Sequence, residues 1–147
     1  QNEQASVQGE LERALGTIAN QPIALRAAGR TDAGVHGTGQ IAAFSTNADR
    51  PVDQWLRGVN GLTPATIQVS WFKPVAAEFH PRFDAVARRY TYLFHDRGRS
   101  NPFMSDLAWC TDALDENAMH VAAQTLLGEH DFSSFRGAGC QSLTPMR

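Results

Sequence analysis

The chain has 147 residues and a formal net charge of −2; 42% of its residues are hydrophobic and 19% are charged. This length suits one domain with its own core, and the composition excludes a collagen, a coiled coil and a disordered chain. No apolar run approaches the roughly 18 residues of a membrane helix. Two cysteines 30 residues apart suggest neither a disulfide framework nor a zinc site, so we expect a cytoplasmic protein without a metal.

Helices are predicted in three places along the chain. Apolar residues recur at helical spacing over 6–19, where Ser6 can cap the first turn and Asn20 stands near the end. Pro51 fits the first turn of a short second helix. The third helix is predicted over 115–127, with apolar residues on one stripe. Each helix therefore has one apolar side to pack against a neighbour.

Four segments are predicted to be strands. These are 22–29 and 40–46, separated by a glycine-rich loop, and the alternating segments 66–72 and 85–95. The order of helices and strands predicts an α+β domain, in which an antiparallel or mixed sheet carries helices on one face.

The glycine-framed loop holds the strongest local pattern, Gly-Arg-Thr-Asp-Ala-Gly-Val-His-Gly at 29–37. In it, Asp32 can act as a nucleophile or general base, and Arg30 can hold that carboxylate ionised and oriented. The structural alternative is a plain turn, because Asp-x-Gly is common in turns. His36 has the same two interpretations, a supporting role or a surface polar residue.

Arginine and aromatic residues concentrate in a second region. Of the 13 basic residues 12 are arginine, and five of these lie within 82–99. On a strand, Arg88, Tyr90 and Tyr92 share one face, which suits base stacking and phosphate contact. The alternative is a half-buried strand with alternating aromatics. The segment Phe-His-Pro-Arg-Phe at 79–83 is either a loop pinned to the core or a contact surface.

Together these motifs resemble the tRNA pseudouridine synthase A family. The loop at 29–36 looks like the family's signature, and further matches follow in the family's order over essentially the whole chain. They are Ser-Val-Gln at 6–8, Gly-Thr-Gly-Gln at 37–40, Phe-His and Arg-Phe within 79–83, Ala-Arg-Arg-Tyr at 87–90, Leu-Gly-Glu-His-Asp-Phe at 127–132, Ser-Phe-Arg at 134–136 and Cys-Gln-Ser at 140–142.

The resemblance implies a pseudouridine-synthase fold and a cofactor-free isomerase. It implies that Asp32 is the nucleophile and that the substrate is tRNA, at positions 38 to 40 of the anticodon stem-loop. The N1–C1′ bond of a uridine breaks and the base rejoins the sugar through C5. Attack at C1′, attack on the base and proton removal to give a glycal all stay open. In each case the uridine must flip out of its stack, at a cost of roughly a few kcal/mol.

The resemblance also assigns roles to other residues. Arg30 matches an arginine implicated in flipping, and Tyr90 matches the tyrosine that stacks on the flipped base. The residues implied to contact tRNA are Arg50, Phe79, His80, Pro81, Arg82, Phe83, Arg88, Cys140, Gln141, Ser142, Leu143 and Thr144.

The chain departs from the family at both ends. It lacks the family's first strand and its C-terminal half, so we expect residues 1–147 to be the N-terminal half of the catalytic domain, inactive or barely active alone. The family implies a homodimer. Two other functions stay open: a catalytically inert α+β module that binds RNA on Tyr90 and Tyr92, and an aspartate-nucleophile hydrolase of small molecules.

Overall fold

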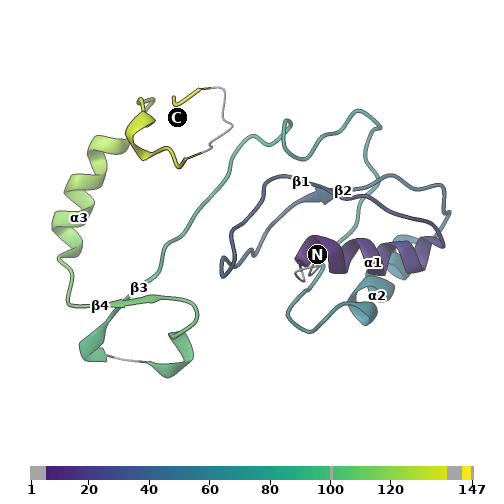
Figure 1. Ribbon diagram of the computed structural model, residues 1–147, viewed down its shortest axis with the longest axis horizontal. Coiled ribbons are helices and arrows are strands. Elements are labelled where there is room, and N and C mark those ends of the chain that lie inside the picture. The colour runs from purple at the N-terminus through teal and green to yellow at the C-terminus, as the bar shows by residue number, and fades with distance from the viewer. Residues whose placement is uncertain (1–5, 100, 139–143, 147) are drawn as a thin grey trace. The chain divides into compact units, whose positions relative to one another are not determined.

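The computed structural model describes residues 6–99, 101–138 and 144–146 (Figure 1). The chain divides into two compact units, Gln1–Tyr90 and Thr91–Arg147. The described residues mix α-helices with two small sheets, so the chain is α+β, as the sequence predicts. Among these residues, no helix combines the length and apolar character that a membrane crossing requires.

Helix α1, Val7–Ala19, begins and ends where the sequence predicts. The hydroxyl of Ser6 accepts a hydrogen bond from the backbone N–H of Gly9 at 3.1 Å, which satisfies one of the free donors of the first turn. The helix stops at Asn20, whose φ of 53° lies in the left-handed region that asparagine tolerates better than most residues. Both caps are therefore encoded in single polar residues.

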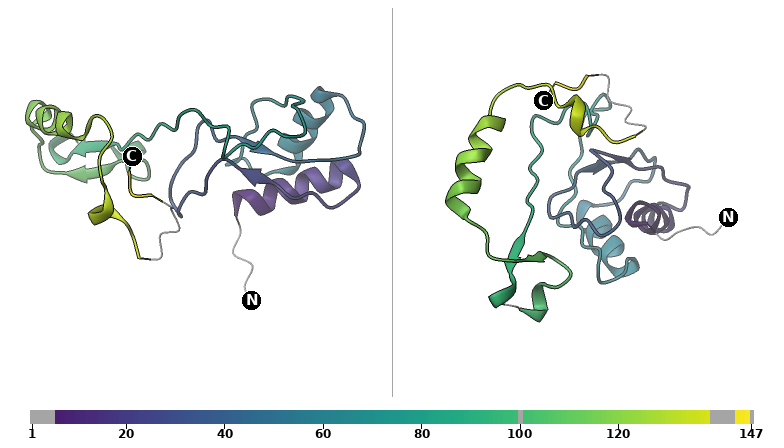
Figure 2. Two further views of the ribbon diagram at one scale, coloured as in Figure 1. Left: turned by 90° about the horizontal axis from the view of Figure 1, so that it is seen from above. Right: turned by 60° about the vertical axis from the view of Figure 1, so that its left-hand side comes forward.

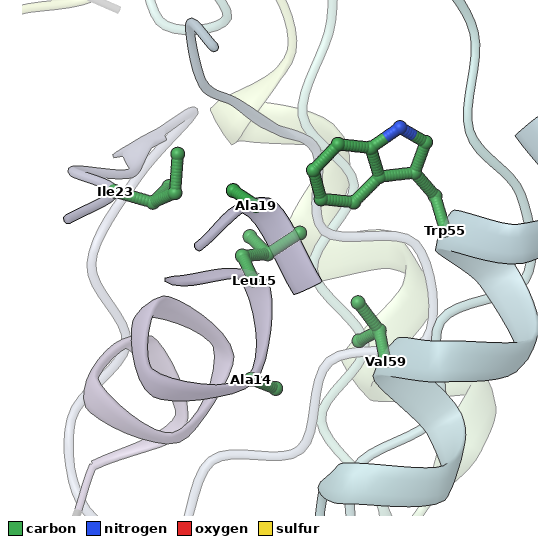
Figure 3. Packing of buried hydrophobic residues seen from close by; sticks show 6 residues of the cluster. All are labelled: Ala14, Leu15, Ala19, Ile23, Trp55 and Val59. Atoms are coloured by element: carbon green, nitrogen blue, oxygen red, sulfur yellow. The ribbon is translucent and has the colours of Figure 1, made fainter. Parts of the chain in front are cut away.

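Helix α2, Val52–Leu62, follows Pro51 and packs on α1. Trp55 and Val59 point from α2 toward Leu15 and Ala19 of α1, and Ile23 closes the cluster (Figure 3). Each large apolar side chain buried here contributes roughly 1.5–3 kcal/mol. The chain segments that follow α1 and α2 pack against this small core.

Two short strands form the sheet of the first unit. β1, Arg26–Ala27, pairs antiparallel with β2, Ala42–Ala43, with Arg26 opposite Ala43. The strands lie inside the predicted segments 22–29 and 40–46 but are much shorter. Between them the chain makes a long loop that extends away from α1 and α2 (Figures 1 and 2).

The strand predicted over 66–72 is absent from the structure. Its central residue is instead paired by a side chain: the amide of Asn60 on α2 donates to the Val69 carbonyl and accepts from the Val69 N–H, both at 2.8 Å. One asparagine thus supplies the two bonds that a neighbouring strand would give. The strand prediction for 66–72 is therefore wrong, because the pairing that alternation suggests is made by a side chain.

The strand predicted over 85–95 is also mostly absent. Only its end pairs, as β3, Phe94–Asp96, which lies parallel to β4, Trp109–Thr111, in the second unit. Within the part of the chain that the structure describes, 85–92 belong to no sheet. β4 was not predicted, because three residues are too few to show alternation.

Helix α3, Glu116–Ala123, begins at Asp115, whose carboxylate accepts from the Ala118 N–H at 2.9 Å. A short 3-10 turn, Gln124–Leu126, continues it, so the predicted range 115–127 is close. Gly128 follows with a φ of 94°, the conformation expected beyond a helix end. Unlike α1 and α2, α3 buries none of its residues.

Candidate functional site

The loop between β1 and β2 displays Asp32 at the start of a tight turn. The Val35 N–H donates to the Asp32 carbonyl at 3.2 Å, and Gly34 has a φ of 83°. A positive φ at the third residue is what a type II turn requires. Asp32 is exposed. Asp32 therefore lies in a turn, as the structural alternative predicted. The turn also exposes its carboxylate to solvent, so the predicted role as a nucleophile or general base stays open.

The base of this loop is fixed by two hydrogen bonds. The Ala28 N–H donates to the Ile41 carbonyl at 2.8 Å, which extends the ladder by one step. At the next step the side-chain amide of Gln40 donates to the Gly29 carbonyl at 2.6 Å. Gln40 belongs to the motif at 37–40, but no role was predicted for it. Its signal was a polar amide directly after Gly39, at the start of the predicted strand 40–46.

The other candidates in the loop are exposed as well. Arg30 and Asp32 form no ion pair within the described ranges, where the ion pairs join other residues. Their pairing therefore remains a prediction for the complex with RNA. His36 is also exposed. The loop thus presents the carboxylate of Asp32 and the guanidinium of Arg30 to solvent. Its backbone is held by the hydrogen bonds of Ala28 and Gln40.

The predicted contact segment 79–83 forms a turn that its own side chains hold. The ring Nδ1 of His80 accepts from the backbone N–H groups of Arg82 and Phe83, at 3.2 and 3.4 Å. The carboxylate of Asp84 accepts from the His80 N–H at 2.8 Å. Pro81 is buried, whereas Phe83 is 76% exposed with its ring 4.3 Å from that of His80. Within the segment, Pro81 is therefore buried and Phe83 is exposed, and contact with RNA through this segment stays a prediction.

Arg88 connects this turn with the Asp32 loop. One guanidinium nitrogen, Nη2, donates to the Arg82 carbonyl at 2.8 Å and to the Ala28 carbonyl at 3.3 Å. The side chain therefore contacts two segments that lie 54 residues apart in the sequence (82 minus 28). The pattern predicted either a phosphate contact or a half-buried strand for Arg88, and it could not reveal these partners, because any residue type offers a carbonyl.

The two tyrosines lie in different settings. Tyr90 is 84% exposed and makes no ring contact within the described ranges. Tyr92 belongs to a cluster in the second unit, where its ring lies 5.0 Å from Phe94 and 6.5 Å from Trp109. Among the described residues, Tyr90 therefore has a ring free of aromatic neighbours, whereas the ring of Tyr92, although 71% exposed, lies against two other rings.

Two further predicted contacts lie outside the loop and turn. The Nε of Arg50 donates to the Ile18 carbonyl at 3.0 Å, near the C-terminal end of α1 where a positive charge is favoured. Thr144 is exposed, and its hydroxyl accepts from the Met146 N–H at 3.1 Å. The remaining predicted contacts, Cys140, Gln141, Ser142 and Leu143, lie outside the described residues.

Comparison with known proteins identifies the family of the chain. Residues 1–84, which include the Asp32 loop and the turn at 79–84, match the model of the tRNA pseudouridine synthase family. Because the match covers more than half of the chain, the chain belongs to this family. The resemblance inferred from the motifs is thus confirmed.

Individual relatives carry the name tRNA pseudouridine synthase A. The chain is 53% identical to that of Hydrogenovibrio crunogenus over 138 residues, which cover 93% of the chain and 53% of the relative. It is 51% identical to those of Vibrio parahaemolyticus and Shewanella piezotolerans, covering 100% and 97% of the chain but 56% and 55% of the relatives. The chain spans about half the length of the curated relatives it matches.

Proposed function

We propose that the protein containing this chain converts uridine to pseudouridine in tRNA, at positions 38 to 40 of the anticodon stem-loop, in the cytoplasm. The observation that carries the proposal is the exposed carboxylate of Asp32 on a loop with a tied base, in a chain of this family. We propose further that the complete domain has an antiparallel or mixed sheet with helices on one face, and works as a homodimer on tRNA.

Asp32 is the proposed nucleophile. The reaction is an isomerisation: the N1–C1′ bond breaks, a C5–C1′ bond forms, the proton on C5 is lost and N1 gains one. A carboxylate assists by attacking C1′ or the base, or by removing a proton to give a glycal. All three routes need an ionised group that a flipped nucleotide can approach, and the exposure of Asp32 meets this need.

The exposed side chains of Arg30 and Tyr90 suit the steps in which the uridine is bound. Arg30 is proposed to assist flipping and then to pair with Asp32, and Tyr90 to stack on the flipped base. The turn at 79–83, together with Arg50 and residues 140–144, is proposed to contact the tRNA, whereas the guanidinium of Arg88 is already bonded to two backbone carbonyls. The exposed ring of Phe83 is the best placed of these for stacking.

An assay of tritium release from tRNA labelled at C5 of uridine tests the proposal. It is run on two proteins: residues 1–147, and a chimera in which they replace the matching part of the Hydrogenovibrio crunogenus relative. The chimera is expected to release tritium and the 147-residue chain to release little or none. Robust turnover by residues 1–147 alone would overturn the proposal that they are half of a catalytic domain.

Substitution of Asp32 tests its role in the same chimera. Asp32→Ala is expected to lower single-turnover release by at least about a thousandfold, a loss of roughly 4 kcal/mol of transition-state stabilisation. The Kd for tRNA should change by no more than about twofold, because the removed carboxylate is negatively charged and does not attract phosphate. Asp49→Ala, an exposed aspartate outside the loop, is the matched control. Retained activity in Asp32→Ala would rule out Asp32 as the nucleophile.

The exposed rings of Tyr90 and Phe83 also favour a second candidate, an RNA-binding module without chemistry. The same experiments separate the two. An inert module binds tRNA equally well with and without Asp32, and its chimera forms no pseudouridine. Tritium release that depends on Asp32 excludes it.

A further inference from the structure

Arg88 occupies a position between the Asp32 loop and the turn at 79–84. Its Nη2 donates to the carbonyls of Ala28 and Arg82, one at the base of the loop and one inside the turn. We propose that Arg88 is a positioning residue: it holds the Asp32 loop and the turn at 79–84 in one fixed arrangement. The proposal rests on the proposed function, in which Asp32 acts on a uridine while the turn holds the RNA.

One of the two carbonyls lies at the base of the Asp32 loop and the other inside the turn at 79–84. Ala28 is the last residue before the loop that carries a ladder bond, through its N–H to the Ile41 carbonyl. Arg82 lies between the buried Pro81 and the exposed Phe83. Hydrogen bonds from a charged donor are about twice as strong as neutral ones, so one guanidinium can couple both points.

Each segment is ordered internally by its own hydrogen bonds. The loop is closed by Gln40 on Gly29, and the turn by His80 and Asp84 on neighbouring N–H groups. Arg88 adds hydrogen bonds that join one segment to the other. Without them, the backbone bonds next to the two carbonyls should open more often.

This role differs physically from a phosphate contact. A phosphate contact would make Arg88 contribute to tRNA affinity and its salt dependence, with no effect on the free protein. A positioning role changes the free protein and the rate of chemistry, because misplacing a catalytic group by about 1 Å costs on the order of a hundredfold.

Three variants separate these roles. Arg88→Met keeps the aliphatic stem and removes every donor; Arg88→Lys keeps the positive charge and one donor nitrogen. Arg89→Met is the matched control, because it removes the same charge from an adjacent exposed residue with no hydrogen bond in the described part of the chain. Amide hydrogen exchange is measured on the 147-residue chain, and tRNA binding and turnover on the chimera.

The expected result is a change at both segments in one variant. Arg88→Met should speed exchange roughly tenfold at the amides of Ala28, Val35, Phe83 and Asp84. The amides of α1 and α2 should not change, which shows that the fold survives. Arg89→Met should leave all of them unchanged, and Arg88→Lys should recover part of the protection. In the chimera, Arg88→Met should lower kcat with little change in KM.

Two results would overturn the proposal. One is unchanged exchange in Arg88→Met together with a salt slope of tRNA binding that falls by about one, the mark of a lost phosphate contact. The other is equally fast exchange at the same four amides in Arg89→Met, because loss of a charge and not of the two bonds would then explain the change. Since exchange is measured without RNA, an inactive chimera would count against the proposed function and not against this tie.

Discussion

A single backbone angle sets how Asp32 is presented. The turn after Asp32 needs the positive φ that Gly34 adopts, at 83°, whereas Gly39 in the same loop has no such requirement. A side chain at either glycine would meet nothing within 4 Å. Any difference between substitutions at these two positions therefore reports the backbone angle and not a clash.

Gly34→Ala is therefore expected to disturb the loop without touching the core. An alanine in the left-handed region costs roughly 1–2 kcal/mol, so part of the population should leave the turn. We expect turnover of the chimera to fall about five- to tenfold with Gly34→Ala and to change less than twofold with Gly39→Ala. The exchange rate of the Val35 amide is the structural measurement. Equal effects of the two substitutions would contradict a role for the turn.

At the scale of elements, the helices were predictable because their signals are local. Ser6 and Asn20 cap α1 from within or beside it, and the apolar spacing of α1 and α2 matches the core they form. Strands need a partner elsewhere in the chain. At 66–72 that partner is the side chain of Asn60, and over 85–92 the described residues supply none. Alternation cannot reveal either fact.

The same division applies to the site. The Asp32 loop was predictable because glycines, acid and base stand together in the sequence. The hydrogen bonds that arrange the loop were not predictable, because Gln40 and Arg88 donate to backbone carbonyls, and any residue type offers a carbonyl. The sequence therefore predicted the loop that carries Asp32, but not the hydrogen bonds of Gln40 and Arg88 that hold this loop.

The turn that follows α3 in the second unit carries a pH prediction. The Asp131 carboxylate accepts from the hydroxyl of Ser133 at 2.6 Å and from its N–H at 2.8 Å. The side-chain bond, and then the backbone bond, lower the pKa of Asp131 below its usual 3.8, because both stabilise the ionised form. The bonds are thus complete above the usual pKa and are lost as pH falls through the lowered value.

An NMR titration of the Ser133 amide checks this. Its shift is expected to follow the Asp131 carboxyl with a midpoint below 3.8, and to become independent of acid in Asp131→Asn. A Ser133 midpoint at or above the usual value would show that the bonds to Ser133 do not favour the ionised form.

For the whole molecule, burial is unevenly divided between the two units. The first unit contains every buried side chain of the core cluster, from Ala14 to Val59. Among the described residues of the second unit, none is buried, and its large side chains such as Phe103 and Val121 are exposed. Since apolar burial is the main favourable term in folding, the two units should differ in local stability.

Amide hydrogen exchange on the 147-residue chain tests this difference. α1 and α2 are expected to exchange slowest, because Leu15, Trp55 and Val59 are buried between them. α3 has eight residues, none buried, and isolated helices shorter than roughly 12–15 residues are marginal in water. Its amides should therefore exchange at least about a hundredfold faster than those of α1. Leu15→Ala, at a cost of roughly 2–5 kcal/mol, should bring the rates in α1 toward those of α3. Comparable protection of α1 and α3 in the unsubstituted chain would show that α3 is stabilised by burial that the structure does not contain.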